Sequence, residues 1–246
     1  GIFNPVLYLE RLENSIKESV PAPVALIVSF PSNPTAQVVD LEFYKELVQI
    51  ALKYNVYILS DLAYAEIFYD NFKPPSILEI SRAKEIAVEF TSMSKTYAMA
   101  GWRIGFAVGN PKLIHALTRI KSYLDYGAFT PVQVAAAAAL NGPQNCVEEI
   151  RNTYQRRRDV LINSMARSGW NIPKPQASMF AWAPIPEKYK GKGSLEFAKE
   201  LMLKADVAVS PGVAFGEFGE GFVRVGLVEN EQRIRQAAKN IKKLLL

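Results

Sequence analysis

Cysteine and histidine are almost absent from this sequence of 246 residues, which contains one of each, Cys146 and His115. A single cysteine excludes an intrachain disulfide, so we expect a reducing, cytoplasmic environment. A single histidine argues against zinc sites built on Cys and His ligands and against a His-based triad within one chain, and we expect no metal site. His115 lies in a helix-like stretch, PKLIHALTRI, where we expect it to pack or to cap the helix rather than to catalyse.

Long apolar runs are also missing. The run VALIVSF has the length of a strand, so we expect no membrane-spanning segment. The first residues, GIFNPVLYLERLENS, match neither a signal peptide nor a transit peptide. The sequence also begins without Met, which indicates that it is part of a longer gene product.

A net charge of +5 raises the question of nucleic-acid binding. The basic residues are dispersed, however, and the densest run, Arg156 to Arg158, lies in a helical stretch that also carries acidic residues. We therefore interpret this run as a solvated helix face and expect no nucleic-acid partner. Apolar residues make up 49% and charged residues 22% of the chain, as in an ordinary globular protein.

Short apolar runs alternate with a helical pattern in the first part of the chain. A buried strand is predicted at 23–30, and the helix after it should be capped by Asp40 and ended by Asn55. The next strand, at 55–61, completes a strand–helix–strand unit, which predicts parallel strands and an α/β fold. Two more buried strands are predicted at 85–92 and 102–109.

Helices dominate next, and the last third of the chain changes character. Helices are predicted at 111–124, at 131–142 with Gly142 as a stop, and at 148–169. We expect a partial large domain at 1–145, a linking helical stretch at 146–160 and a smaller α+β domain at 161–246. The predicted elements of that smaller domain are strands within 178–185, 206–212 and 222–228 and amphipathic helices at 194–204 and 229–245.

Polar side chains follow the predicted strands at the points where each strand ends. Asn33, Asp61, Ser92 and Lys95 all lie just past the carboxyl end of a strand. Open α/β sheets bind their ligands at that edge. If the strands are neighbours, these four residues predict one binding site.

Lys95 stands among hydroxyl groups in the stretch TSMSKTYAMAGWRIGF, residues 91–106. A lysine amine whose environment favours the neutral form can react with a carbonyl to give a Schiff base. The hydroxyls of Ser92 and Ser94 and the guanidinium of Arg103 suit a phosphate group. This predicts a ligand that carries an aldehyde and a phosphate, although Lys95 taken alone is more simply a lysine in a strand-to-helix turn.

Asp61 adds the second half of this interpretation. A carboxylate at the end of a buried strand needs a cation, and the protonated nitrogen of a pyridine ring would provide one. Pyridoxal phosphate needs that proton in order to act as an electron sink. Tyr64 and Asn33 have the chemistry to bind the ring hydroxyl, but Tyr64 packing as a core residue and Asn33 shaping a turn are equally consistent with the sequence.

Three segments in this order, FPSNPTA, SDLAY and SMSKTYAMAGWRIGF, resemble class I/II aminotransferases of pyridoxal-phosphate fold type I, and the resemblance covers essentially the whole chain. It implies an α/β fold, with a partial large domain built on a mostly parallel sheet and a smaller C-terminal α+β domain. It also implies that Lys95 carries pyridoxal 5'-phosphate covalently as a Schiff base and that Asp61 pairs with the ring nitrogen.

The same resemblance implies further roles. Arg224, in GFVRVGL, grips the substrate carboxylate, and strand alternation puts its apolar neighbours on the opposite face. The loop from Tyr126 to Thr130 reaches the neighbouring subunit's site, which implies a homodimer and a substrate-binding role for Tyr126. Tyr64 and Asn33 bind the ring oxygen, and Ser92, Ser94 and Arg103 bind the phosphate.

Only 32 residues precede Asn33, whereas the family has an N-terminal arm, a phosphate-binding turn and a ring-stacking aromatic residue before this point. We therefore expect the chain to be the C-terminal part of an aminotransferase. By itself it should bind the cofactor poorly and be inactive.

The segments SYLDYGAFTPVQVAAAAAL, KPQASMFAW and SPGVAFGEFG resemble the alanine-type branch, which includes LL-diaminopimelate aminotransferases. The implied reaction is amino-group transfer between an L-amino acid and a 2-oxo acid such as 2-oxoglutarate, in amino-acid metabolism and biosynthesis. Tyr126 stands where plant-type diaminopimelate enzymes have asparagine, which argues modestly against that substrate; aspartate stays open. So do another fold-type I enzyme, such as a lyase or synthase, and a non-catalytic ligand-sensing domain.

Overall fold

The computed structural model describes residues 3–245, and its internal contacts divide the chain into two units. The first unit runs up to Pro31 and includes Gln37–Glu66 and Lys73–Glu148. The second takes the chain from Glu149 onward together with two short segments, Ser32–Ala36 and Ile67–Phe72. These two segments belong by contact to the second unit although the first unit surrounds them in the sequence.

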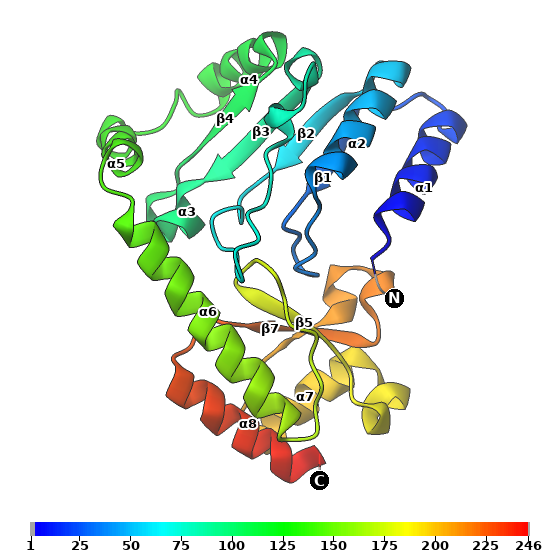
Figure 1. The fold of residues 1–246 in the computed structure, drawn as a ribbon, viewed down its shortest axis with the longest axis vertical. Helices are drawn as coiled ribbons and strands as arrows, with labels where there is room; N and C mark the ends of the chain where they lie inside the picture. The colour runs from blue at the N-terminus through cyan, green and yellow to red at the C-terminus, as the bar shows by residue number, and fades with distance from the viewer. Residues whose placement is uncertain (1–2, 246) are drawn as a thin grey trace. The chain divides into compact units, whose positions relative to one another are not determined.

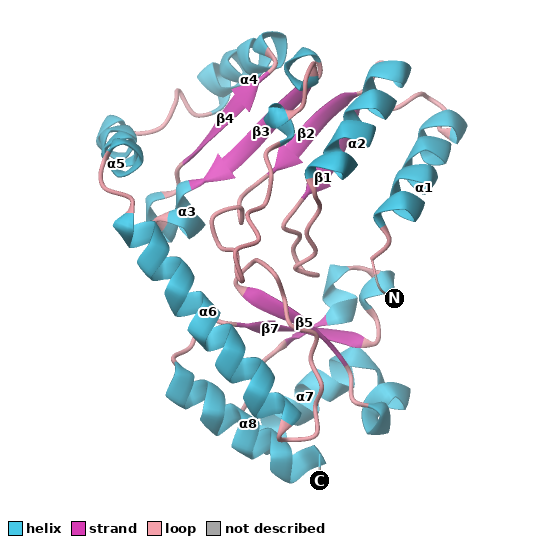
Figure 2. Ribbon diagram, viewed as in Figure 1, coloured by secondary structure: helices cyan, strands magenta, loops and turns pink. Residues whose placement is uncertain are grey.

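A mostly parallel sheet forms the centre of the first unit (Figure 2). Its strands lie in the order β1-β2-β3-β4; the first three run parallel, and β4 is antiparallel to β3. The expected α/β fold with a mostly parallel sheet is therefore confirmed. The strands are β1 (Ala25–Ser29), β2 (Tyr57–Asp61), β3 (Ala87–Ser92) and β4 (Gly105–Gly109).

The helix between β1 and β2, α2 (Leu41–Tyr54), packs its apolar stripe onto this sheet. Asp40 caps it as predicted, because its carboxylate accepts a hydrogen bond of 2.9 Å from the Phe43 amide. Asn55 ends it in the left-handed conformation, with φ of 53°. Leu47 and Ala51, on the apolar stripe of α2, are fully buried.

A helix that was not predicted, α1 (Pro5–Glu18), lies beside α2 (Figure 1). Asn4 caps it with a hydrogen bond from the Leu7 amide, and Pro5 occupies its first turn. Asn at the N-cap followed by Pro in the first turn is typical of a helix start. The remaining elements of the first unit are η1 (Ile77–Glu79), η2 (Ala83–Glu85), α3 (Met93–Thr96), η3 (Ala100–Trp102), α4 (Pro111–Leu124) and α5 (Thr130–Asn141).

Two expectations about the first unit were wrong. The strand predicted within 102–109 is not buried, since Phe106 and Val108 of β4 are 40% and 45% exposed. The reason is that β4 is an edge strand of the described sheet. His115 neither packs nor caps; it is exposed in the interior of α4.

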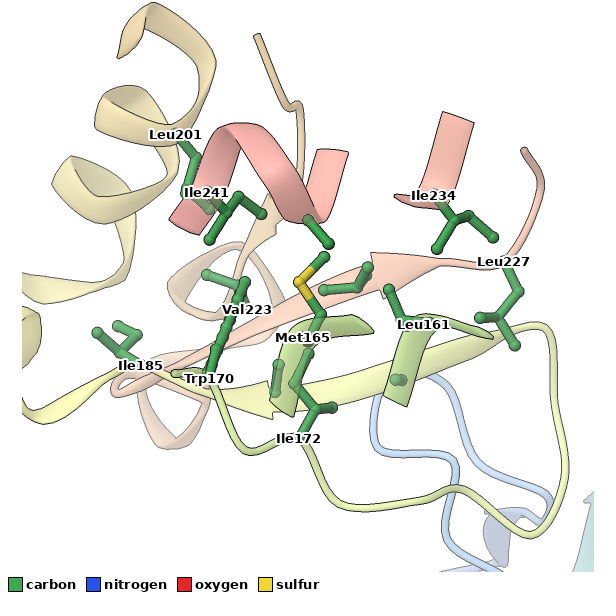
Figure 3. Packing of buried hydrophobic residues seen from close by; sticks show 14 of the residues in the cluster. Leu161, Met165, Trp170, Ile172, Ile185, Leu201, Val223, Leu227, Ile234 and Ile241 are labelled. Atoms are coloured by element: carbon green, nitrogen blue, oxygen red, sulfur yellow. The ribbon is translucent and has the colours of Figure 1, made fainter. Parts of the chain in front are cut away.

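The second unit contains an antiparallel sheet in the order β5-β7-β6 with helices packed on one face. Figure 3 shows this core, in which Leu161 and Met165 of α6 lie close to Ile234 and Ile241 of α8, with Trp170 beside them. The elements are α6 (Asn145–Ala166), β5 (Phe180–Pro184), η4 (Glu187–Lys192), α7 (Gly193–Ala205), β6 (Ser210–Pro211), η5 (Gly212–Phe215), η6 (Glu217–Gly219), β7 (Phe222–Gly226) and α8 (Glu231–Leu245).

The basic run of α6 is not a fully solvated face, contrary to the prediction. The Arg156 side chain is 62% exposed, but that of Arg158 is completely buried. Arg158 donates to both oxygens of Asp70 and to the Pro175 carbonyl, and its guanidinium lies 4.4 Å from the centre of the Tyr69 ring. A buried charge is tolerated when it is paired in this way. The pair ties the Ile67–Phe72 segment to α6.

None of the described helices is both long and apolar enough to cross a membrane.

Candidate active site

The carboxyl ends of the parallel strands meet at one edge of the first unit's sheet. Ser29 at the end of β1 is in register with Asp61 at the end of β2, and Asp61 is in register with Phe90 of β3. β3 ends at Ser92, and α3 begins directly after it and carries Lys95. The structure thus brings Asp61, Ser92 and Lys95 to this edge.

Asn33, which the sequence predicted at the same edge, lies in the Ser32–Ala36 segment that belongs to the second unit. Its polar partner there is Arg224. The predicted site residues therefore fall into two groups, one in each unit.

Asp61 is partly buried and is held by two hydrogen bonds. The Ser29 hydroxyl donates to Oδ2 at 3.3 Å, and the Ala63 amide donates to Oδ1 at 3.1 Å. No cationic side chain among residues 3–245 forms an ion pair with this carboxylate. Neutral donors therefore fix the orientation of this carboxylate, and its oxygens can still accept from a cationic ligand atom.

Lys95 lies next to Tyr64. Its ammonium nitrogen is 5.9 Å from the centre of the Tyr64 ring, which stands in the turn that follows β2. Within the described part of the chain, Nζ makes neither a hydrogen bond nor an ion pair. A partly buried amine with an aromatic ring as its neighbour is accessible for reaction with a carbonyl ligand.

The hydroxyl groups around Lys95 also organise the turn. Ser92 caps α3, with its Oγ accepting from the Ser94 amide at 3.2 Å, and Thr96 donates back to the Ser92 carbonyl at 3.4 Å. Arg103 adopts a left-handed conformation with φ of 51°, and one guanidinium nitrogen donates to the Ala100 carbonyl at 3.0 Å. This anchor uses Nη1 and leaves Nε and Nη2 as further donors for an anion.

Arg224 stands in the middle of β7, and the predicted alternation is confirmed because Val223 and Val225 are buried on the other face. Nη1 donates to Oδ1 of Asn33 at 2.8 Å, and Nη2 donates to the Ser210 hydroxyl at 3.3 Å. The guanidinium carbon also lies 4.6 Å from the centre of the Phe215 ring.

Sequence reasoning missed Ser210 and Phe215. Both occur in the segment SPGVAFGEFG, but only the pairing of β6 with β7 reveals that Ser210 lies opposite Arg224.

Tyr126 stands in the turn after α4 with φ of 54° and is 93% exposed. It makes no hydrogen bond or ring contact with any residue that the structure describes. Tyr123, Leu124 and Phe129, close to it in the sequence, are 76%, 76% and 73% exposed. The exposed segment 123–129 is therefore unusually apolar for a free surface.

The sequence model of the family described as aminotransferase class I and II matches residues 6–241. The chain belongs to this family. It is 55% identical over 235 residues to the glutamate-pyruvate aminotransferase AlaC of Escherichia coli, a match that covers 96% of this chain and 57% of that protein. It is 41% identical over 232 residues to the LL-diaminopimelate aminotransferase of Moorella thermoacetica, covering 92% of this chain and 59% of that one.

Among solved structures, the apo form of BacF from Bacillus subtilis resembles this aminotransferase fold with a TM-score of 0.87 at 35% identity. The likeness covers 92% of this chain and 57% of that chain. The expectation of a fold-type I aminotransferase is thereby confirmed. The chain spans less than three fifths of the length of each of these three proteins.

Aminotransferases of this family use pyridoxal phosphate, and the donor set of the first unit fits that cofactor. An amine suits its aldehyde, a carboxylate suits its protonated ring nitrogen, and hydroxyl and guanidinium donors suit its phosphate. A phenol such as that of Tyr64 has the chemistry to bind the ring oxygen.

Proposed function

We propose that the protein is a pyridoxal-phosphate-dependent transaminase that moves an amino group between an L-amino acid and a 2-oxo acid. The observation that carries this proposal is that Lys95 and Asp61 both lie at one edge of the first unit's sheet. The amine lies 5.9 Å from the Tyr64 ring centre with no ion-pair partner among the described residues, and the carboxylate is oriented by Ser29. Family membership supports it independently.

Bound pyridoxal phosphate supplies an electron sink for the charge that develops at the substrate Cα. We assign Lys95 to hold the cofactor covalently through Nζ. The Nζ amine would also act as the general base for the Cα proton of the substrate and as the general acid that returns a proton. Asp61 would accept a hydrogen bond from the ring nitrogen and so favour its protonated form. Tyr64 and Asn33 would donate to the ring oxygen, and Ser92, Ser94 and Arg103 would bind the phosphate.

For the substrate we assign Arg224 to the α-carboxylate, because a planar guanidinium matches a carboxylate with two parallel hydrogen bonds. Its bonds to Asn33 and Ser210 support this role, since they fix the direction of the guanidinium.

Alanine as donor and 2-oxoglutarate as acceptor are the favoured pair. The support is the higher identity to the glutamate-pyruvate relative, 55%, than to the LL-diaminopimelate relative, 41%. LL-Diaminopimelate is the second candidate donor, because the chain is 41% identical to an LL-diaminopimelate aminotransferase. Aspartate is the third candidate donor.

The test uses the full-length gene product. Incubation with 2-oxoglutarate and each of the three donors, followed by assay of glutamate and of the 2-oxo acid formed, should show the fastest turnover with alanine. Lys95→Ala should abolish turnover and remove the cofactor's visible absorbance from the gel-filtered protein. Absorbance that depends on Lys95 without any 2-oxo acid product would contradict the transaminase proposal and favour another reaction of the same fold type.

We also propose that the protein is a cytoplasmic homodimer in which Tyr126 reaches the neighbouring subunit's substrate. The exposed apolar segment 123–129 supports the dimer, and the exposed free thiol of Cys146 suits a reducing compartment. Light scattering on the full-length gene product should give the mass of a dimer. Phe129→Glu should lower the measured mass toward that of a monomer. Lys112→Glu, which changes an exposed residue on α4, should leave the mass unchanged.

A further inference from the structure

On one face of the second unit's sheet, Arg224 is surrounded by aromatic rings and by a hydroxyl group. In the sheet register Trp182 of β5 and Ser210 of β6 lie directly opposite Arg224 of β7, one on each side. Residues directly opposite one another share a face of the sheet. Arg224 is therefore flanked by an indole ring on one strand and by a hydroxyl on the other.

Two phenyl rings contact the guanidinium as well. Its central carbon lies 4.6 Å from the centre of the Phe215 ring and 5.2 Å from that of Phe180. Phe180 is buried in the sheet, whereas Phe215 is 37% exposed and comes from η5, directly after β6. A ring that stacks on a guanidinium attracts the cation through its face and leaves the N–H groups at the edge for hydrogen bonds.

Only two of the edge N–H groups are used within the described chain. Nη1 donates to Asn33 at 2.8 Å and Nη2 donates to Ser210 at 3.3 Å. A guanidinium has five N–H groups, so one hydrogen remains on each terminal nitrogen. That is the number a two-point carboxylate contact requires.

We infer that Phe215 and Ser210 are positioning residues for Arg224. The Phe215 ring fixes the plane of the guanidinium, and the Ser210 hydroxyl fixes its rotation within that plane, so that the two N–H groups left on the terminal nitrogens stay aimed at a carboxylate. The inference rests on the proposed substrate role of Arg224. Both residues should affect the affinity for amino acids and for 2-oxo acids in the same way, because the two kinds of substrate carry the same carboxylate.

The consequence is a specific kinetic signature. An arginine that is less well oriented binds the carboxylate less well in the ground state and in the transition state, which raises KM and leaves kcat unchanged. In the full-length enzyme, Phe215→Leu should raise KM for both substrates by about three- to tenfold, with kcat changed by less than about twofold. Ser210→Ala should raise KM by about two- to fivefold.

Conservative variants and a matched control separate this role from general packing. Phe215→Tyr keeps the ring face and Ser210→Thr keeps the hydroxyl, so both should retain KM near that of the unmodified enzyme. Phe222→Leu is the control, because Phe222 lies on the same face and stacks on Trp182 at 5.4 Å without a ring contact to Arg224. It should leave KM unchanged.

A binding measurement without turnover gives an independent readout. Calorimetric titration of 2-oxoglutarate, with no amino donor present, should show Kd raised by the same factors as KM. If Phe215→Leu and Ser210→Ala bind 2-oxoglutarate as tightly as the Phe222→Leu control, the inference is overturned.

Arg224→Ala in the same series separates the positioning role of Phe215 and Ser210 from the substrate role of Arg224. If Arg224→Ala weakens binding and the Phe215 and Ser210 variants do not, the positioning role fails and the role of Arg224 stands. If Arg224→Ala itself leaves Kd unchanged, the proposed substrate role of Arg224 is wrong, and the positioning role falls with it.

Discussion

Arg158 and Asp70 form a two-point ion pair, with Nη1 2.8 Å from Oδ2 and Nη2 3.0 Å from Oδ1. The arginine is fully buried and comes from α6, whereas the aspartate is 47% exposed and stands in the Ile67–Phe72 segment. Tyr69 of the same segment stacks under the guanidinium and donates its own hydroxyl to the Ser178 carbonyl. One arginine thus anchors a segment that begins three residues after Tyr64.

Asp70→Asn should destabilise the protein by about 2–3 kcal/mol, because it leaves a buried guanidinium with Asp159 as its remaining carboxylate partner. Urea unfolding followed by circular dichroism measures the change in the free energy of unfolding. Glu196→Gln is the matched control, since it breaks an exposed pair with Lys199 on α7 and should cost less than about 0.5 kcal/mol. Equal losses in the two variants would contradict the structural role of the buried pair.

The same pair predicts a pH dependence. The hydrogen bond from Arg158, reinforced by Lys174, lowers the pKa of Asp70 from 3.8 to about 2. A carboxyl whose pKa is lower in the folded state stabilises the protein above its unfolded pKa, and this contribution is lost as the pH falls toward the folded pKa. The unmodified protein should therefore have a higher free energy of unfolding than Asp70→Asn. The difference between the two should be constant above about pH 5 and shrink between pH 3.8 and 2. If the difference in the free energy of unfolding is still undiminished near pH 2, the lowered pKa of Asp70 is not its cause.

Ala98→Gly should stabilise the fold. Ala98 is exposed and has φ of 54°, a left-handed conformation in which its Cβ is strained. Glycine removes that strain but gains freedom in the unfolded state, so the net gain should be about 0.5 kcal/mol. The melting temperature measures both variants and should rise in Ala98→Gly. Ala137→Gly, which changes an exposed alanine within α5, should lower the melting temperature, with a loss of about 1 kcal/mol in the free energy of unfolding. A loss of stability in both variants would show that the left-handed alanine is not strained.

Asp61→Asn should lower kcat of the full-length enzyme by about 10²–10³ while the protein still folds, because asparagine keeps the shape and its carbonyl oxygen can still accept from Ser29. An amide has no charge to hold a proton on the ring nitrogen of the cofactor. Steady-state kinetics with alanine and 2-oxoglutarate measure the effect. Asp40→Asn is the control, because Asp40 serves as the N-cap of α2 and asparagine is also a good cap, and it should leave kcat unchanged. A kcat near the original value in Asp61→Asn would remove Asp61 from the proposed mechanism.

The parts of the fold that were predicted correctly depend on neighbours in the sequence. The cap at Asp40, the left-handed stop at Asn55 and the alternation around Arg224 each follow from a few adjacent residues. The order of strands and helices follows in the same way, because the hydrophobic period is a local property.

The wrong predictions concern burial and partners, which are set by residues far away in the sequence. The run Arg156 to Arg158 is polar by composition, yet Arg158 is buried because Asp70, 88 residues earlier, meets it. β4 is apolar, yet it stays exposed because it lies at the edge of the described sheet. Neither fact has a signal in the surrounding residues.

The sequence by itself determined the candidate side chains for the proposed reaction, since a lysine among hydroxyls and an aspartate at a strand end are local features. Only the tertiary structure decided how Arg224 is held, because Asn33 is 191 residues away in the chain and Ser210 meets it only through the register of two strands. The physical reason is that hydrogen bonds and ring contacts act over a few ångströms in space, and the path of the backbone alone sets which residues come that close.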